Sequence, residues 1–295
     1  MNEKILFFFS KLIGEYATLK NEVMWMSIIT KITTQQKNKE RFNIFVDEGK
    51  GEKYAFSVDE AVLIKFQLKK GMELDPFFLT EIQYEDDIRK SYNMAIRYLA
   101  RVMRTEHEVR SYLKEKEVEE PVIREVIVKL YEYQFLDDEQ YAISFVRTKK
   151  NTTDKGTVVI KRELVEKGVK EQFIEQALKE YTFDEQVETA YSICKKEVAK
   201  NKSDSSIVLK QKLEQKLIRK GFSFDIIAEV TSNIELKSND EVFQALQYQA
   251  EKIKKKYSHE SGFQYIQKVK AALFRKGFSL EMIEEYLRNT VEEDE

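Results

Sequence analysis

Apolar and polar positions alternate over only one region of the chain, residues 27–56. The stretches SIITKITT, RFNIFV and KYAFS are rich in β-branched and aromatic residues, and DEGKGE lies before the last of them. This composition is typical of strands joined by turns, so we predict a three-stranded antiparallel meander. Ser57 and Glu60 have the spacing of a capping box, which predicts a helix from there to about Lys69, ended by Gly71.

From Asp75-Pro76, a typical helix start, apolar residues recur at helical spacing to the end of the chain. Within this region a pattern of Leu, two residues, Lys, usually Gly, an apolar residue and a later apolar pair occurs four times. The copies are LKEKEVEEPVI, LVEKGVKEQFI, LIRKGFSFDII and LFRKGFSLEMI, which begin at Leu113, Leu164, Leu217 and Leu273. Intervals of 51, 53 and 56 residues predict a tandem array of helical repeats.

Each repeat is expected to contain three helices, because a further helix marked by small and apolar residues precedes each copy of the pattern. These residues are Ala95 with Leu99, Ala142 with Phe145, Ala190 with Ile193, and Ala245 with Tyr248. Capping residues support this phasing. They are Thr105 with Glu108 in repeat one, Asp137 or Asp138 in repeat two, Ser203 to Ser206 in repeat three, and Asn239 or Asp240 in repeat four.

The repeated pattern predicts a turn between the second and third helix of each repeat. In its last copy, Gly277 suits the left-handed position after a helix, and Phe278 can pack back onto Leu273. Ser279 is then the cap of the third helix, and Phe278 also pairs with Ile283. Repeat three has the same residue types, from Leu217 through Gly221, Phe222 and Ser223 to Ile227. Most of the pattern is therefore structural.

Two copies depart from the pattern. Repeat two has Lys170, a poor cap, in the position of the serine. Repeat one has Glu117 in place of the glycine. Because a side chain makes the left-handed conformation costlier, the sequence leaves the geometry of the turn in repeat one open.

The whole composition agrees with a helical protein. The 295 residues are 35% charged and include only 9 Gly and 2 Pro, so helix breakers are few. Cys194 is the single cysteine, which excludes an intramolecular disulfide and fits a reducing, cytoplasmic location. The apolar stretch Ile5 to Ile13 is too short for a membrane span and lacks a convincing cleavage site for a signal peptide.

Charge is unevenly distributed, although the formal net charge is only −2. Phe145 to Lys170 and Lys195 to Lys220 are strongly basic, whereas Arg101 to Val146 and the tail Val291 to Glu295 are acidic. On a helical array, such cations can form a strip that meets nucleic acid or an acidic protein groove. The candidate binding residues are Arg147, Lys149, Lys150, Lys155, Lys161, Arg162, Arg219, Lys220, Lys254, Lys255, Lys256, Arg275 and Lys276. For the pairs before Gly221 and Gly277, the alternative is that they only complement the helix dipole.

No motif predicts catalysis, a metal or a cofactor. The two histidines, His107 and His259, are far apart in the sequence, and no cluster has metal-ligand spacing. TTDKGT at 152–157 lacks the spacing of a phosphate-binding loop. Cys194 is expected to be a buried, inert thiol, and Asp137-Asp138 is expected to cap a helix rather than bind a metal.

Several stretches resemble the long form of the RecX family of bacterial recombination regulators. They are FNIFVDEGKGEKYAFSVDE, AIRYLARVMRTEHEVRSYLKEK, FLDDEQYAISFVRTKK and KGTVVIKRELVEKGV, and the resemblance covers about residues 26–290. Residues that match recurring family positions are Asp137, Asp138, Gly156, Glu163, Leu164 and Gly168. Residues 1–25 lie outside the resemblance, so we predict that translation begins at Met24 or Met26.

The resemblance implies an elongated, curved array of three-helix repeats that follows a small N-terminal β module. It implies a cytoplasmic, non-enzymatic and monomeric protein without a cofactor. Its implied partners are RecA and the RecA–single-stranded DNA filament, with single- or double-stranded DNA in addition. The expected divisions are 1–25, an extension; 26–75, the β module with a helix; 76–136, a linker helix and repeat one; 137–183, repeat two; 184–237, repeat three; 238–290, repeat four; and 291–295, an acidic tail.

Three functions remain to be distinguished from the sequence. A filament regulator, usually inhibitory, should prefer RecA-coated single-stranded DNA, and charge reversal at Lys149, Lys150, Lys161 and Arg162 should weaken its binding. A helical-repeat DNA-binding protein should act on DNA directly. A protein scaffold should bind neither.

Overall fold

The computed structural model of the chain describes residues 26–259 and 262–292. The chain forms two compact units. Of the described residues, one unit contains those up to Met103 together with Val109–Leu136, and the other contains Arg104–Glu108 and those from Asp137 onward. The predictions for residues 1–25 and for the last three residues of the acidic tail lie outside the described residues. We describe each unit by itself.

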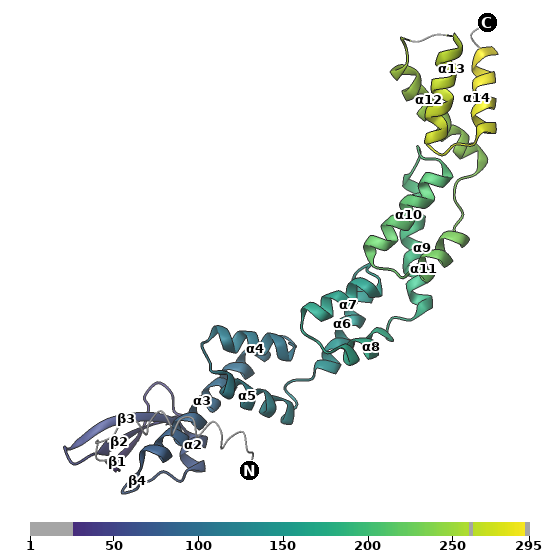
Figure 1. The fold of residues 1–295 in the computed structure, drawn as a ribbon. Coiled ribbons are helices and arrows are strands. Elements are labelled where there is room, and N and C mark those ends of the chain that lie inside the picture. The colour runs from purple at the N-terminus through teal and green to yellow at the C-terminus, as the bar shows by residue number, and fades with distance from the viewer. Residues whose placement is uncertain (1–25, 260–261, 293–295) are drawn as a thin grey trace. The chain divides into compact units, whose positions relative to one another are not determined.

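A four-stranded antiparallel sheet begins the first unit, with the strand order β3-β2-β1-β4 (Figure 1). The strands are β1 (Ser27–Thr34), β2 (Arg41–Asp47), β3 (Glu52–Asp59) and β4 (Glu73–Leu74). The predicted three-stranded meander is thus incomplete. The chain returns beside β1, where the Gly71 amide donates to the Ile29 carbonyl at 2.7 Å and the Ile29 amide donates to the Met72 carbonyl at 2.9 Å.

The predicted helix start at Ser57 is wrong by two residues. Ser57 lies in β3, paired with Asn43. The strand continues because Val58 is buried in the core of the sheet module. Asp59 caps helix α2 (Glu60–Lys65) by accepting a hydrogen bond from the Ala61 amide at 3.1 Å. The helix also ends before the predicted Lys69.

Helix α3 (Pro76–Leu99) begins as predicted, with Pro76 in its first turn and the Asp75 carboxylate accepting from the Phe78 amide at 2.7 Å. One ion pair ties this helix to the sheet. The guanidinium of Arg41 donates to both carboxylate oxygens of Asp86, at 2.9 and 3.2 Å, and the Asp59 amide donates to the same carboxylate at 2.8 Å. Asp86 is almost completely buried, so these donors replace the water that it loses.

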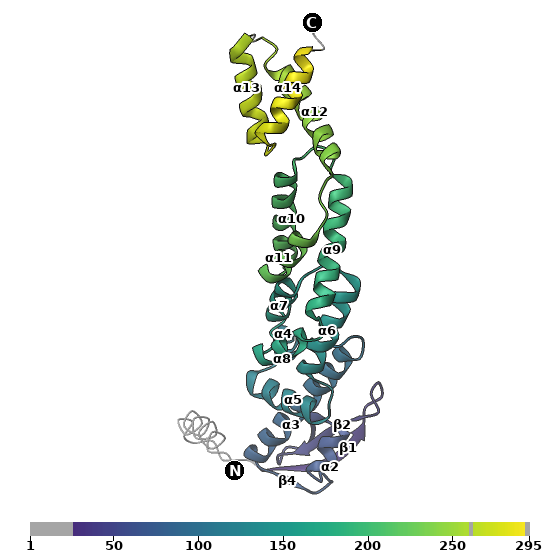
Figure 2. The ribbon, with the colours of Figure 1, turned by 90° about the vertical axis from the view of Figure 1, so that its right-hand side faces the viewer.

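Four groups of three helices follow one another, which confirms the predicted tandem three-helix repeats (Figure 2). Repeat one consists of α3, α4 (Glu106–Glu115) and α5 (Glu120–Glu132), and repeat two of α6 (Asp138–Thr152), α7 (Thr157–Glu166) and α8 (Glu171–Leu178). Repeat three consists of α9 (Phe183–Lys200), α10 (Ser206–Lys220) and α11 (Phe224–Asn233), and repeat four of α12 (Asn239–Lys256), α13 (Gly262–Arg275) and α14 (Leu280–Glu292). Each repeat buries an apolar core of its own.

The predicted turn occurs between the second and third helices of all four repeats. In repeat three, the Phe222 amide donates to the Leu217 carbonyl at 3.1 Å and the Gly221 amide donates to the Ile218 carbonyl at 2.9 Å. This is the Schellman pattern, and Gly221 has the left-handed φ of 85° that the pattern requires. Phe222 is buried. The apolar residue therefore closes one helix and packs beside the next.

The turn of repeat one has the same geometry without glycine. Glu117 has a φ of 60°, the Val118 amide donates to the Leu113 carbonyl at 3.1 Å, and the Glu117 amide donates to the Lys114 carbonyl at 2.9 Å. The Glu117 side chain is exposed. The turn is therefore set by the helix end and by the apolar residue after it, and glycine is not obligatory.

Most predicted caps are confirmed. Thr105 and Glu108 form the reciprocal bonds of a capping box at 3.1 and 3.2 Å, and Ser205 caps α10. In repeat four the cap is Ser238 rather than Asn239 or Asp240, because Glu241 completes a capping box with Ser238. Among the helices that the structure describes, none is long and apolar enough to cross a membrane.

Candidate functional site

The repeated turn has a second role that the sequence did not reveal. In the second unit, the carbonyl of the lysine before each turn glycine accepts a hydrogen bond from the residue that begins the second helix of the preceding repeat. The Oγ1 atom of Thr105 donates to Lys167 at 2.7 Å. The Gly156 amide donates to Lys220 at 2.8 Å, and the Oγ atom of Ser205 donates to Lys276 at 2.7 Å. We call each of these contacts a joint.

The joints leave no room for a side chain at the turn glycine. A Cβ atom on Gly221 would lie 2.5 Å from Cγ2 of Val159, and one on Gly277 would lie 2.6 Å from Oγ of Ser205. A Cβ atom on Gly168 would lie 2.4 Å from Cβ of His107, and one on Gly156 would lie 2.2 Å from the Gly221 carbonyl oxygen. These glycines are therefore required for the joints as well as for the turns.

The lysine of the repeated pattern also belongs to the joint in two repeats. The ammonium of Lys167 contacts Glu108 at 2.8 Å, and that of Lys220 contacts Asp154 at 2.5 Å. The Asp154 pKa is lowered, chiefly by its hydrogen bond from Lys220. Lys276 makes no salt bridge among the described residues. The cation before the glycine is thus structural in repeats two and three and unengaged in repeat four.

The two aspartates of FLDDEQYA cap different helices. Asp137 caps its own helix, α6, by accepting from the Gln140 amide at 2.8 Å. Asp138 instead accepts from the Glu106 amide, at the start of α4, at 2.9 Å. Burial raises the pKa of Asp138. Asp138 is almost completely buried, and each of the two adjacent aspartates caps a helix of its own.

The basic residues predicted to form a strip in repeat two are mostly paired with carboxylates of the same unit. Lys149 and Lys155 both contact Glu163, Lys149 at 2.8 Å. Burial would raise the pKa of Glu163, but hydrogen bonds from these two lysines lower it. The remaining pairs are Arg147 with Glu180 at 2.8 Å, Lys150 with Glu185 at 2.7 Å, and Lys161 with Glu171. Arg162 is exposed and makes no salt bridge in the described parts of the chain.

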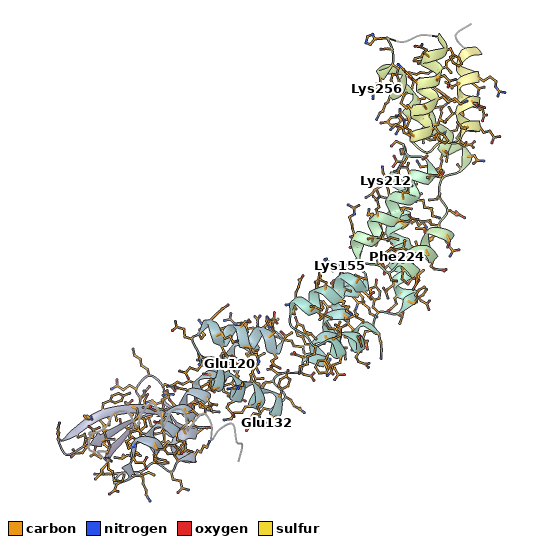
Figure 3. The ribbon with its side chains drawn as sticks, viewed as in Figure 1. Glu120, Glu132, Lys155, Lys212, Phe224 and Lys256 are labelled. Atoms are coloured by element: carbon orange, nitrogen blue, oxygen red, sulfur yellow. The ribbon has the colours of Figure 1, made fainter. Side chains whose placement is uncertain are left out.

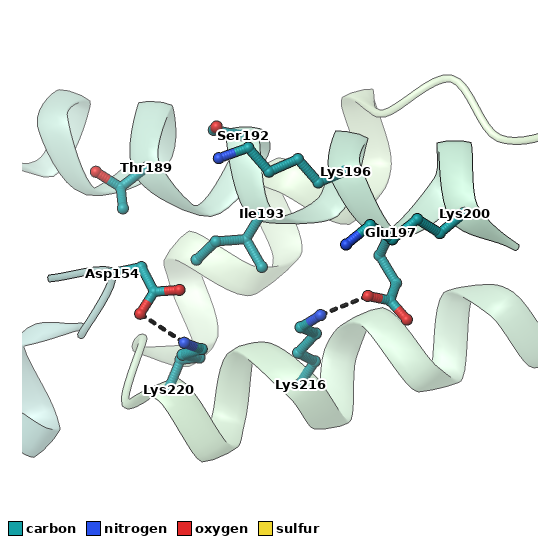
Figure 4. Close-up of a pocket in the computed structure, with 9 residues that line it drawn as sticks. All are labelled: Asp154, Thr189, Ser192, Ile193, Lys196, Glu197, Lys200, Lys216 and Lys220. Carbon is teal, nitrogen blue, oxygen red and sulfur yellow. Dashed lines mark hydrogen bonds and ion pairs between the residues drawn. The ribbon is translucent and has the colours of Figure 1, made fainter.

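A groove of about 340 Å³ lies between the first two helices of repeat three (Figure 4). Four lysines line it, but two of them are neutralised by carboxylates in the same groove: Lys220 by Asp154 and Lys216 by Glu197. The other two lysines are Lys196 and Lys200, one helical turn apart on α9. Sequence reasoning missed this pair, although their four-residue spacing places both on one face of the helix.

The matching groove of repeat four has about 410 Å³ and no carboxylate in its lining. Its cations are Lys252, Lys256, Arg275 and Lys276, from α12 and the end of α13. The ammonium of Lys252 lies 4.3 Å from the ring centre of Tyr248, and that of Lys256 lies 5.7 Å from the ring centre of Tyr257. Figure 3 shows Lys256 at the end of α12. Lys256, Arg275 and Lys276 were predicted as candidate binding residues.

The other predicted candidates do not share a groove. The guanidinium of Arg219 donates to the Gln215 carbonyl of its own helix at 3.4 Å. The ammonium of Lys254 lies 5.2 Å from the ring centre of Tyr286. Lys255 is exposed. Arg219, Lys254 and Lys255 therefore lie outside the lining of the two grooves.

Acidic clusters, the cysteine and the histidines were the other candidates for chemistry. The described residues contain no group of three or more His, Cys, Asp or Glu residues that could hold a metal ion. Cys194 is fully buried, and burial raises its pKa to about 11, so it remains a neutral thiol at physiological pH. His107 packs against the turn glycine Gly168. The prominent chemical feature of the described surface is the unpaired positive charge in repeat four.

Comparison with known proteins assigns each part of this architecture. Sequence profiles described as the regulatory protein RecX N-terminal domain and the first and second three-helix domains of RecX match residues 27–75, 92–130 and 137–178. The profile of the third three-helix domain matches twice, at 184–231 and 239–287. The chain belongs to the RecX family. Repeats three and four of this RecX chain are thus two copies of one domain type.

Individual RecX proteins agree with this assignment. The chain is 45% identical over 266 residues to the regulatory protein RecX of Halalkalibacterium halodurans, a match that covers 90% of this chain and all of that protein. It is 45% identical over 264 residues to the regulatory protein RecX of Bacillus subtilis, covering 89% and 98% of the two chains. A crystal structure of regulatory protein RecX matches with a TM-score of 0.63 and 36% identity, over 70% of this chain and all of that one.

Proposed function

We propose that this RecX protein binds RecA, lies in the groove of the RecA–single-stranded DNA filament, and inhibits the recombinase, ATPase and coprotease activities. The observation that carries the proposal is the match to RecX proteins over about nine-tenths of the chain. No catalytic residue is needed for this function. Regulation of this kind requires only a surface that binds the filament and slows its turnover.

The structure supports a binding role in two ways. The joints link successive repeats of the second unit through a few atoms at the helix ends, so side chains on the rest of each repeat remain available for a partner. Unpaired cations in repeat four provide a surface that attracts a polyanion. A RecA filament on single-stranded DNA presents such a polyanion to a regulator that lies within its groove.

Titration of the purified chain against RecA assembled on single-stranded DNA tests the proposal. We expect the chain to lower the rate of ATP hydrolysis and the yield of strand exchange in proportion to the amount bound. RecA without added protein and RecA with heat-unfolded protein are the controls. Unchanged ATP hydrolysis and strand exchange at saturating protein would contradict the proposed function.

A second candidate function is direct action on DNA, which the carboxylate-free groove of repeat four favours. The two functions differ in their preferred ligand. A filament regulator binds RecA-coated single-stranded DNA more tightly than naked DNA, whereas a direct DNA-binding protein shows no such preference. Binding titrations with both ligands in the same buffer distinguish them.

The structure shows which basic residue of repeat two can be reversed in charge without breaking an ion pair. Lys149, Lys150 and Lys161 are held in ion pairs, so their reversal would also place like charges together. Arg162 has no such partner in the described chain. We expect Arg162→Glu to weaken filament binding without a loss of thermal stability, while Arg162→Lys retains binding.

A further inference from the structure

Repeats three and four align without gaps over their first two helices, with an offset of 56 residues. This offset places α9 on α12, and six positions line the groove in both repeats. Lys196 and Lys200 correspond to Lys252 and Lys256, and Lys220 corresponds to Lys276. The grooves are therefore the same structural position in two copies of one domain, and their differences can be compared directly.

Both carboxylates of the repeat-three groove are absent from the repeat-four groove. Glu197 and its partner Lys216 are replaced by Ile253 and Ala272, so one ion pair becomes an apolar pair. Asp154 lies three residues before the start of α7, and Ser203 occupies the same place before α10. Lys276 consequently lacks the carboxylate that Lys220 contacts at 2.5 Å.

The result is a large difference in the charge of two related grooves. The groove of repeat three contains four lysines and two carboxylates, a balance of two positive charges. The groove of repeat four contains Lys252, Lys256, Arg275 and Lys276 and no carboxylate, a balance of four. Like charges held close together without counter-ions in the protein favour the binding of an external anion.

Aromatic rings accompany these cations. Tyr248, beneath the ammonium of Lys252, is 51% exposed, and Tyr257 lies beside Lys256 in the groove lining. Positive charge that follows a backbone, together with exposed aromatic rings on which bases stack, is the combination that binds single-stranded nucleic acid. An acidic protein segment would use the cations but would leave the rings without a role.

We infer that the groove between α12 and α13 binds the phosphodiester backbone of single-stranded nucleic acid, whereas the matching groove of repeat three, where Glu197 and Asp154 neutralise two of the four lysines, binds it more weakly. The inference rests on the proposed function, because it assigns one contact with the filament to the DNA rather than to RecA. It also divides two copies of one domain into a binding copy and a structural copy.

Matched substitutions in the two grooves test the inference in the full chain. Lys252→Gln with Lys256→Gln removes two cations from repeat four, and Lys196→Gln with Lys200→Gln removes the equivalent pair from repeat three. Fluorescence anisotropy of a labelled oligothymidylate measures binding over a series of salt concentrations. Each lysine that neutralises a phosphate releases counterions from the oligonucleotide, so the repeat-four variant should bind about tenfold more weakly at moderate salt. The slope of the logarithm of its binding constant against the logarithm of the salt concentration should become shallower by about 1.4. The repeat-three variant should remain within about twofold of the unchanged protein.

A reciprocal exchange of one residue changes the charge of each groove without removal of a cation. Ser203→Asp places a carboxylate beside the repeat-four groove, at the position that Asp154 occupies beside the repeat-three groove, and should weaken oligothymidylate binding. Asp154→Ser removes that carboxylate from the repeat-three groove and should strengthen binding. Circular dichroism spectra and thermal unfolding of each variant show that the fold is retained.

Three results would overturn the inference. In the first, the unchanged protein fails to bind oligothymidylate, and in the second, the two double variants lose the same oligothymidylate affinity. In the third, the repeat-four variant loses affinity for RecA in the absence of DNA but keeps its affinity for oligothymidylate. The last would assign the groove to an acidic protein segment. Failure of the proposed function is distinguishable. If the unchanged protein binds oligothymidylate through repeat four but leaves RecA-catalysed ATP hydrolysis unaffected, the groove assignment stands and the RecA regulation does not.

Discussion

A side chain in a left-handed conformation ordinarily indicates strain, and Glu117 shows why repeat one tolerates it. Its φ of 60° matches the turn glycines of the other repeats, but its side chain is exposed. Gly168, Gly221 and Gly277 face an atom of a neighbouring repeat where a Cβ would be. Glycine is thus required at these positions because the neighbouring repeat leaves no room for a Cβ atom. Where no neighbour is close, the left-handed turn tolerates a side chain at a cost of about 1–2 kcal/mol in stability.

Replacement of Glu117 by glycine should therefore stabilise repeat one. Relief of the left-handed strain outweighs the greater flexibility of glycine in the unfolded chain, so we expect a gain of about 0.5–1 kcal/mol in the free energy of unfolding. Urea titration measures it. Glu117→Ala is the matched control, because alanine removes the charge and keeps the strain. A gain of the same size in both variants would assign the effect to charge.

Asp86 is a second position where a single side chain has a large effect. Burial would raise its pKa, but hydrogen bonds from Arg41 and Lys90 and from the Asp59 amide lower it. A lowered pKa stabilises the folded state above the ordinary pKa of aspartate, and this stability is lost as the pH falls through the folded value. The contact between α3 and the sheet should therefore weaken in acid.

Asp86→Asn should cost the first unit about 3 kcal/mol at neutral pH, because it leaves the largely buried guanidinium of Arg41 without its counter-charge. The difference from the unchanged protein should shrink below about pH 4, where the carboxylate of the unfolded chain is protonated, and should vanish as the pH falls through the lowered pKa of the folded state. Urea titrations over this range, followed by the amide resonances of β2 and β3, measure it. Asp87→Asn is the control, since that side chain is 58% exposed and should change stability by under about 0.5 kcal/mol.

Some elements of the fold could be predicted from neighbouring residues in the sequence, and others depend on residues far apart. The turn of each repeat was predicted in detail, because Leu217, Gly221 and Phe222 lie within six positions and their spacing alone defines the turn. The fourth strand was missed, since Glu73-Leu74 is too short to show alternation. Only the return of the chain beside β1 creates it.

The joints and the ion pairs of repeat two were missed for a related reason. Thr105 and Lys167 are 62 positions apart in the sequence. The acceptor of the contact is a backbone carbonyl, which every residue type has, so the sequence does not indicate it. Lys149 and Lys155 form part of a basic stretch in the sequence, but folding brings Glu163 against both. The charge of a segment therefore did not predict the charge of the surface.

The cost of a side chain in a joint can be separated from the cost of the left-handed turn. Gly221 and Gly71 have φ values of 85° and 86°, but a Cβ on Gly71 has no atom within 4 Å. Gly71→Ala should cost about 1 kcal/mol from backbone strain alone. Gly221→Ala should cost at least about 2 kcal/mol more, because Val159 and its helix must move. Equal losses in urea titrations of the two variants would show that the joint adjusts freely.

Along the complete chain, stability should depend on which joint is altered. In an array of repeats, each repeat contributes its own stability and an interface with its neighbour. The repeats of the second unit each have their own core, and a joint connects repeat three with repeat four. Loss of one joint is therefore expected to separate the array at that point rather than to unfold it as a whole.

Gly277→Ala should release repeat four selectively. A Cβ there would contact Oγ of Ser205 at 2.6 Å, the atom that donates to the Lys276 carbonyl. We expect amide hydrogen exchange in α12, α13 and α14 to accelerate about tenfold or more, corresponding to a loss of about 1.4 kcal/mol, while exchange in α6 stays unchanged. Ser205→Ala, which removes the joint hydrogen bond and the cap of α10 without introducing a clash, is a comparison variant. Uniform acceleration throughout the second unit would mean that it unfolds as one cooperative block.

The backbone contact between Gly156 and Lys220 has a consequence for the ancestry of the chain. Every interior repeat provides both halves of a joint, a donor at the start of its second helix and an acceptor before its turn. A duplicated gene segment that encodes one repeat would thus bring a working connection at each end, with no new surface to evolve. The double match of repeats three and four to one domain type fits growth by this route. The different linings of the two grooves show that copies of one domain type can carry different surface charge while the joint between them is kept.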